Sequence, residues 1–527
     1  MINQNQERLL YAFLVIAIFF GVVVRFWSLD SGLFWRDEPI LFIAALKLNH
    51  HDPSIHDLDP RFWHAQYPPV GTYIMGLPTV FYDTDYTEII KFEREWPLLY
   101  LPAEILKNTY YLMRLMSALM GLITVVFIFL ITKTLWGTKP ALWSTVVAAL
   151  SVDYIGISRV SFLEVYMIAF FMGTLFFLIK YLQEKNSIKK FVYLSLIFIF
   201  TILTLGTRWG PPFLLYPILL LSVILNRKER ANLKMILIFL LAIAATWPIF
   251  YYFINLPKTI PTLVEVAGAQ SLFVNNVFYY LSSFAFKNSY LFLFGILFSI
   301  FWYYIALRKN FIERPKSFLL NPDERMVVLL FFLISTVFFS VTLFGANSRY
   351  FLVSFAPAMI LMGKPLANLS QKKIIVGAII ILLLITIWSI FHFFPYYTSY
   401  GNFGSVDFEV LDFNSPYDLL PEQQEIFSFL KEQGNPTVFT NLPNLLVFYD
   451  GKAMPIPPYN TKFSLARLCD GNLKELMKNS YVIILGREWI FCEELASVEM
   501  DFIKEFGKGV GTEEKFAFGT ISIFKVK

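Results

Sequence analysis

The chain has 527 residues, of which 57% are hydrophobic and only 16% are charged, and its mean hydropathy is +0.57. This balance excludes an ordinary soluble enzyme and predicts an integral membrane protein. The formal net charge of +5 comes largely from lysines and arginines beside apolar segments. It therefore indicates anchoring at a membrane surface and excludes a nucleic-acid partner.

The apolar residues are concentrated in long runs, and runs of about 18 residues or more are typical of transmembrane helices. The sequence predicts about eleven such helices, so the expected fold class is a polytopic α-helical membrane protein. The first run is followed by no small-residue cleavage site, which argues against a cleavable signal peptide. The predicted helices cover residues 9–27, 112–132, 141–157, 160–182, 191–206, 208–225, 235–254, 289–307, 326–344, 350–366 and 374–394.

The loops between these runs differ in their content of basic residues, and cytoplasmic loops are enriched in lysine and arginine. One set of loops carries single arginines only, namely Arg159, Arg208 and Arg349. The pattern predicts a cytoplasmic N-terminus and an external C-terminus in the cell membrane. The other set carries Lys133, Lys139, Lys185, Lys189, Lys190, Arg227, Lys228, Arg230, Lys234, Arg308, Lys309, Arg314, Lys316, Lys372 and Lys373.

The predicted transmembrane domain covers residues 1–399 and has two long external loops, 28–111 and 255–288. Apolar stretches at 39–48 and 69–81 predict two short helices along the membrane surface. Residues 400–527 predict a soluble extracytoplasmic α/β domain, because charges return and short β-rich runs alternate with helical patterns. The runs are Thr437–Thr440, Tyr481–Leu485 and Gly519–Val526, with a helix at Glu422–Gln433 closed by Gly434.

The two cysteines of the chain, Cys469 and Cys492, both lie in this C-terminal part. Outside the cytoplasm a disulfide can persist, so a covalent bridge and two buried thiols are both open. Four of the five histidines, His50, His51, His56 and His64, lie in the first loop. Their residue types suit a divalent metal, but their spacing matches no standard metal site, and solvated loop histidines are the alternative.

An acidic pair, Asp37 and Glu38, lies a few residues after the first predicted helix ends. At this depth water is scarce, and a carboxylate there becomes a stronger and more tunable base. Glu164 lies within an apolar run, where an ionised group is costly unless it is paired. Together these groups suit an anionic lipid headgroup and an acceptor that needs a base, although each alone could anchor a helix end. The other ionisable groups at external helix ends are Arg114, Arg208 and Arg349 with Tyr350.

These residues occur in an order that resembles a known family. The pattern is Asp37-Glu38, then Tyr67-Pro68-Pro69-Val70-Gly71, Arg114-Leu115-Met116-Ser117-Ala118, Glu164, and Arg349-Tyr350 before a proline-containing helix. It resembles the GT-C glycosyltransferases of the protein O-mannosyltransferase and lipid A aminoarabinose transferase type, over about residues 1–370. The resemblance implies a polyprenyl-phosphate sugar donor, an inverting transfer and an aspartate of the first loop, here Asp37, as the base.

The chain also departs from the family pattern. Tyr67 stands where family members usually carry a histidine or lysine beside the Pro-Pro pair, and Glu164 stands where they usually carry aspartate. These departures shift the expected phosphate contact to the three arginines at positions 114, 208 and 349. The Trp-Trp-Asp motif of oligosaccharyltransferases is absent from the sequence, which favours a single sugar as the transferred group.

Two classes of function remain at this point. The first is a membrane glycosyltransferase in which Asp37 deprotonates the acceptor hydroxyl. Glu38 then either hydrogen-bonds the acceptor or the sugar, or raises the pKa of Asp37 through its like charge. Its acceptor is a protein, a glycan end or a lipid headgroup. The second is a transporter or lipid flippase, which would place ionisable groups near the midplane and show two similar halves. The charges lie at external helix ends and no halves repeat, so the sequence favours the enzyme.

Overall fold

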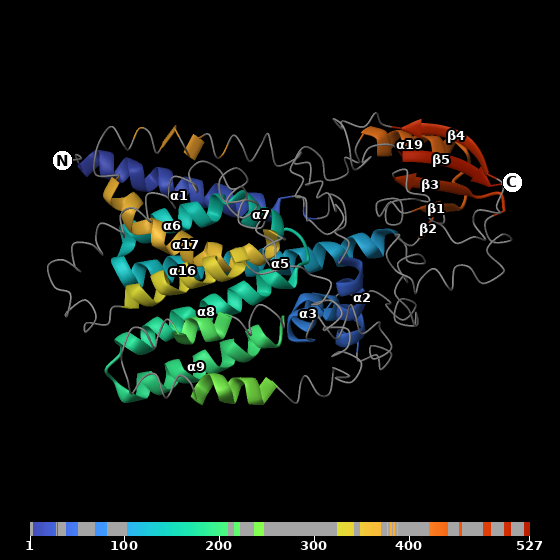
Figure 1. Ribbon diagram of the computed structural model, residues 1–527. Coiled ribbons are helices and arrows are strands. Elements are labelled where there is room, and N and C mark those ends of the chain that lie inside the picture. Colours follow the sequence, from blue (N-terminus) through green and yellow to red (C-terminus); the bar gives the residue numbers. More distant parts are fainter. Residues whose placement is uncertain are drawn as a thin grey trace.

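The structure of the protein is a computed structural model that describes a helix bundle and a C-terminal sheet with one helix (Figure 1). The described residues are 4–27, 29, 38–50, 69–81, 103–208, 215–221, 237–246, 324–341, 348–369, single positions between 377 and 387, 421–440, 453–455, 478–485, 500–506 and 521–526.

Seven helices form most of the described bundle and run side by side in Figure 1. Four of these helices contain stretches long and apolar enough to cross a membrane: Arg8–Phe26, Tyr111–Trp136, Leu163–Gln183 and Ser187–Leu205. The prediction of membrane helices is confirmed for these four, whereas the count of eleven stays a prediction. The seven are α1 (Gln4–Phe26), α5 (Ala103–Trp136), α6 (Thr138–Leu150), α8 (Leu163–Gln183), α9 (Ser187–Leu205), α16 (Glu324–Val341) and α17 (Ser348–Leu369).

The prediction of one helix over 141–157 is wrong, because the chain forms α6 and a separate short helix, α7 (Val152–Ser158). Ser151 between them is extended, with φ −64° and ψ 113°. The guanidinium of Arg25 donates hydrogen bonds to the carbonyl oxygens of Ala148 (2.8 Å) and Ala149 (2.6 Å). These carbonyls would otherwise bond to the next turn of a continuous helix. The contact with Arg25 therefore accompanies the break.

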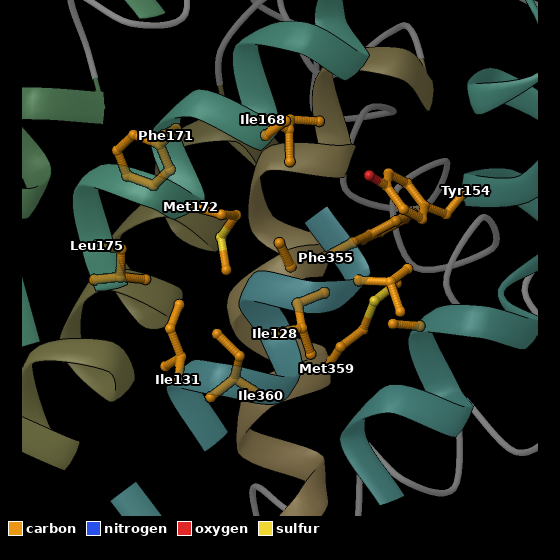
Figure 2. Close-up of a cluster of buried hydrophobic side chains, with 14 of the residues drawn as sticks. Ile128, Ile131, Tyr154, Ile168, Phe171, Met172, Leu175, Phe355, Met359 and Ile360 are labelled. Atoms are coloured by element: carbon orange, nitrogen blue, oxygen red, sulfur yellow. The ribbon is translucent and has the colours of Figure 1, made fainter. Parts of the chain in front are cut away.

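The core of the bundle lies where α17 packs between α5 and α8 (Figure 2). The ring of Phe171 on α8 also lies 5.1 Å from that of Phe331 on α16. On its other side α17 contacts α6, where Ser144 Oγ donates to the Ile360 carbonyl oxygen at 3.1 Å. The labelled side chains of this core are Ile128, Ile131, Tyr154, Ile168, Phe171, Met172, Leu175, Phe355, Met359 and Ile360.

Two short helices lie in the first long loop, as the sequence predicts. They are α2 (Glu38–Asn49) and α3 (Pro69–Gly76), and a 3₁₀ helix, η2 (Leu77–Phe81), follows α3. Asn49 Nδ2 at the end of α2 donates to the Tyr73 carbonyl oxygen of α3 at 3.1 Å. A Cβ at Gly76 would lie 2.5 Å from that nitrogen, so the two helices are in close contact. The start of α2 is thereby linked to the position of α3.

The C-terminal region contains a five-stranded sheet among the described residues, in the order β2-β1-β3-β5-β4. Neighbours are parallel from β2 to β3, and β5 is antiparallel to both β3 and β4. Strands occur in each of the three predicted β-rich runs. The strands are β1 (Val438–Thr440), β2 (Ala453–Pro455), β3 (Tyr481–Leu485), β4 (Met500–Phe506) and β5 (Ile521–Val526).

One helix, α19 (Pro421–Glu432), packs against this sheet. Its Ile426 and Leu430 contact Val438 and Ile483, so an apolar helix stripe covers one sheet face. The predicted stop at Gly434 is confirmed: its φ of +79° suits glycine, and its N–H bonds the Lys431 carbonyl oxygen at 3.0 Å. Cys469 and Cys492 lie outside the described residues.

The contact between α17 and α6 generates a stability prediction. A Cβ at Gly363 would lie 2.1 Å from Ser144 Oγ and 2.4 Å from the Pro140 carbonyl oxygen, so the helices must separate. Gly363→Ala should lower the free energy of unfolding by about 1–3 kcal/mol, seen as a lower thermal midpoint in detergent. Gly377→Ala is the matched control, because no atom of the described residues lies within 4 Å of that Cβ. Equal midpoints for the two variants would contradict the close contact.

Candidate functional site

Several charged side chains are buried where α1, α7 and α9 end and where α8 begins. We call this region the α3 end of the bundle, because α3 also contacts it. Here Arg25, Arg159 and Glu164 are fully buried, and Arg114 of α5 is 1% exposed. Buried charges need partners, since an isolated charge is costly to remove from water. The contacts of these groups therefore define the site.

Glu164 and Arg208 form a buried ion pair, with 3.1 Å between Arg208 Nη2 and Glu164 Oε1. Glu164 lies in the first turn of α8, and Arg208 lies just beyond the end of α9. The turn between α8 and α9 is short, so the helices are antiparallel and these two ends are adjacent. A helix N-terminus favours an anion and a C-terminus favours a cation, so both dipoles support this arrangement. The requirement that Glu164 be paired is met.

The end of the Pro-Pro motif contacts the residues that precede Arg208. The N–H of Val70 donates to the Gly206 carbonyl oxygen at 2.9 Å. A Cβ on Gly71 would lie 2.5 Å from Thr207 Cγ2 and 3.0 Å from Leu163 Cδ2. The first turn of α3 therefore packs against both chain segments that carry the ion pair. Tyr67 itself lies outside the described residues.

Three further arginines hydrogen-bond to backbone carbonyl groups at this end. Arg25 bonds the last turn of α6, as described above, and its guanidinium carbon lies 5.5 Å from the centre of the Tyr154 ring. Arg159 Nη1 donates to the carbonyl oxygen of Val24. Arg114 Nη1 donates to the carbonyl oxygen of Leu29 at 3.2 Å. Each of these contacts joins α1, or the residues just after it, to another part of the bundle.

Arg114 and Arg159 are close enough to influence each other. Burial lowers the pKa of Arg159, and the neighbouring positive charge of Arg114 lowers it further. Two adjacent cations in a buried region create a positive potential that favours an anion. Ser117, one turn after Arg114, donates to the Tyr166 hydroxyl at 3.4 Å and so connects α5 to α8 beside Glu164.

The remaining predicted site residues are described in part or not at all. Glu38 begins α2, and Arg349 and Tyr350 lie in the first turn of α17; the structure describes only the backbone of all three. Asp37 lies outside the described residues. Among the weak metal candidates, His50 follows α2 directly and the other three fall outside the described residues. The part of the chain that the structure describes holds no cluster of three or more metal-binding side chains.

Sequence reasoning missed two of the buried arginines as site residues. Arg25 lies within the first apolar run, where it resembles a membrane-surface anchor, and Arg159 resembles an ordinary loop charge. The sequence offered one signal for Arg25: it lies two residues before the end of the first predicted helix, 9–27, on the chain that leads to the acidic pair. No sequence pattern marks a backbone carbonyl as the partner of either side chain.

The ion pair should behave as one energetic unit. Arg208→Gln leaves a buried carboxylate without its cation, and Glu164→Gln leaves the cation without its carboxylate, so each should lower the free energy of unfolding by about 3–5 kcal/mol. The double variant should cost less than the two single costs added together. Thermal unfolding in detergent measures all three variants. Additive losses would contradict a direct interaction.

The chain resembles known proteins in the sequence of one part and in its fold. Residues 58–244 match the family described as dolichyl-phosphate-mannose-protein mannosyltransferase. This range includes Glu164, Arg208 and the Pro-Pro motif, but not the acidic pair. No curated protein sequence matches the chain.

Solved structures resemble this chain in fold. The crystal structure of ArnT from Cupriavidus metallidurans bound to undecaprenyl phosphate has a TM-score of 0.59 at 12% identity, covering 97% of this chain and 98% of that one. Its apo state has a TM-score of 0.52 at 11% identity, with the same coverage. The oligosaccharyltransferase of Archaeoglobus fulgidus has a TM-score of 0.49 at 12% identity and covers 90% of this chain and 67% of that one.

At these identities the structural likeness concerns the fold. Combined with the family match and the apolar helices, it shows a multi-pass membrane protein whose chemistry is glycosyl transfer. The chain is similar to the GT-C glycosyltransferases: residues 58–244 match the protein-mannosyltransferase family, and the fold resembles that of ArnT.

Proposed function

We propose that the protein transfers a single sugar from a polyprenyl-phosphate donor to an acceptor hydroxyl, with inversion, on the extracytoplasmic face of the membrane. The observation that carries this proposal is the packing of the start of α3 against Leu163, Gly206 and Thr207, the residues that flank the Glu164–Arg208 ion pair. Because α2 packs on α3, contacts connect the helix that begins at Glu38, next to the proposed base Asp37, with the chain segment that carries Arg208.

The donor phosphate would lie at the α3 end of the bundle. A guanidinium carries five N–H donors in a planar fork, so Arg208 can donate hydrogen bonds to the Glu164 carboxylate and to a phosphate at the same time. Arg114 and Arg349 are the other proposed phosphate contacts, and Tyr350 and Tyr67 are proposed substrate contacts. The ArnT structure of the same fold holds undecaprenyl phosphate, which supports a polyprenyl-phosphate donor for this chain.

The proposed base is Asp37, directly before α2. It would take the proton of the acceptor hydroxyl as that oxygen attacks the anomeric carbon from the side opposite the phosphate. The bond from the anomeric carbon to the phosphate oxygen breaks, and the polyprenyl phosphate leaves with its charge stabilised by arginine. Attack from the opposite side inverts the anomeric configuration. Glu38, as the first residue of α2, would hydrogen-bond the acceptor or the sugar.

The family match guides the choice of the first substrates to test. It makes polyprenyl-phosphate mannose the first donor, and the serine or threonine hydroxyl of a peptide the first acceptor. Purified full-length protein in detergent should release polyprenyl phosphate from a radiolabelled donor only when a suitable acceptor is present. Absence of release with every common polyprenyl-phosphate sugar and with peptide, glycan and lipid acceptors would overturn the proposal.

The assignment of the base predicts a specific kinetic pattern. Asp37→Asn preserves the shape of the side chain but removes the base, so kcat should fall about 10²–10⁴-fold. Glu38→Gln is the matched neighbour variant and should raise the apparent KM for the substrate more than it lowers kcat. Steady-state kinetics on both variants, with thermal unfolding as a check of folding, test the assignment. Near-normal turnover in Asp37→Asn together with inactive Glu38→Gln or Glu164→Gln would reject Asp37 as the base.

A further inference from the structure

A cluster of buried hydroxyl groups lies inside the bundle, where three parts of the chain meet. Its centre is Tyr216, which belongs to the helical residues 215–221. The Tyr216 hydroxyl lies 3.2 Å from Thr174 Oγ1 of α8. It also hydrogen-bonds the side chains of Thr201 and Thr204 of α9. All four side chains are buried, so the cluster is closed to solvent.

The two threonines of α9 act as acceptors in this hydroxyl cluster. Thr201 and Thr204 each donate to the carbonyl oxygen four residues earlier in α9, at 2.7 Å, so their own protons are already used. Thr174 makes the same kind of bond within α8, but at a longer distance of 3.3 Å. The cluster is satisfied when Thr174 donates to Tyr216 and Tyr216 donates to one threonine of α9. The Tyr216 hydroxyl thereby links α8 to α9.

Packing alone does not require the Tyr216 hydroxyl. The Tyr216 ring lies 5.7 Å from the ring of Phe171 and 5.1 Å from that of Phe239, and a phenylalanine would make the same ring contacts. A buried hydroxyl costs free energy unless it is hydrogen-bonded. The best-attested benefit of such buried polar groups is that they fix the register of neighbouring helices. The hydroxyl cluster therefore fits a role in setting the positions of α8 and α9 along their axes.

The position of α9 along its axis decides whether the ion pair forms. A shift of α9 by one turn would move Arg208 by about 5.4 Å relative to Glu164, which would break their 3.1 Å contact. Thr204 is also bonded to Arg208 through the backbone, since its carbonyl oxygen accepts from the Arg208 N–H at 3.3 Å. Described contacts thus lead from the Tyr216 hydroxyl through Thr204 to Arg208.

We propose that Tyr216 is a positioning residue for the Arg208 guanidinium. Its hydroxyl holds the last turn of α9 against α8, so that Arg208 can bond Glu164 and the donor phosphate together. This inference rests on the proposed function, in which Arg208 contacts the phosphate. Loss of the hydroxyl should therefore affect the use of the donor and leave the affinity for the acceptor unchanged.

A double-mutant cycle between Tyr216 and Arg208 tests the proposal. Tyr216→Phe retains the ring but removes the hydroxyl, and kcat/KM for the donor should fall about three- to tenfold, the effect of one net hydrogen bond. The KM for a serine or threonine peptide acceptor should stay nearly the same. In an Arg208→Lys background the same change should cause little further loss, because a flexible ammonium depends less on the backbone position. Initial rates of polyprenyl-phosphate release from polyprenyl-phosphate mannose measure each protein.

Threonine variants keep the test decisive if Tyr216→Phe does not fold. Thr204→Val has the same shape but removes one partner of Tyr216, so it should lower the donor kcat/KM by a similar factor. Thr145→Val is the matched control, because Thr145 is buried and donates to the Ala141 carbonyl oxygen at 2.7 Å. Thr145 lies on α6, which contributes no residue to the hydroxyl cluster, so this variant should leave the donor kcat/KM unchanged.

Three results would overturn the inference. If folded Tyr216→Phe or Thr204→Val protein keeps the full donor kcat/KM, the hydroxyl cluster does not position Arg208. If the loss is equally large in the Arg208→Lys background, it does not act through Arg208. If the acceptor KM rises together with the loss for the donor, the effect is a general loosening of the site. All three results leave the proposed function intact, whereas absence of polyprenyl-phosphate release by the natural protein overturns both.

Discussion

Backbone carbonyl groups at the ends of α1 and α6 have no partners within their own helices, and buried arginines supply the missing hydrogen bonds. Arg25 of α1 bonds the last turn of α6, and Arg159 after α7 bonds the last turn of α1. Each helix end is therefore completed by a side chain from another element. A cation at a helix C-terminus is also favoured by the helix dipole. The positions of α1, α6 and α7 are coupled for this reason, and the site is built on them.

The basic side chains at the two ends of the bundle differ in their burial and in their partners. At the end opposite α3, Lys133, Lys185 and Lys189 are exposed, as suits a strongly hydrated ammonium that marks a membrane surface. At the α3 end the described arginines are buried and bond carbonyls or a carboxylate, and Lys47 of α2, which packs on α3, is buried as well. Guanidinium is more weakly hydrated and offers several directed donors, so it tolerates burial more readily than an ammonium does. The directed N–H donors of a guanidinium also suit a phosphate.

Much of the architecture could be predicted from periodicity and hydropathy alone. The helices α1, α8 and α9, the strand β3 and the stop at Gly434 follow from apolar runs, alternation and a glycine, which are local signals. The need of Glu164 for a partner followed from its apolar surroundings, but its pairing with Arg208 depends on the antiparallel packing of α8 and α9. The break at Ser151 could not be predicted, because the hydrogen bonds that accompany it join a distant arginine to carbonyl groups that every residue carries. The place of Asp37 stays a prediction.

The shortness of α6 has a consequence for how the bundle crosses a membrane. Its 13 residues rise about 20 Å, whereas the hydrocarbon core of a bilayer is about 30 Å thick. It is therefore about 10 Å too short to cross such a core alone, and the break at Ser151 falls at a depth that a full-length helix would pass. Irregular backbone at that depth must be shielded from lipid, and the arginine bonds at Ala148 and Ala149 provide this. The short helix α7 continues the chain from this break, so the bundle replaces one long helix with two short ones joined at buried arginine bonds.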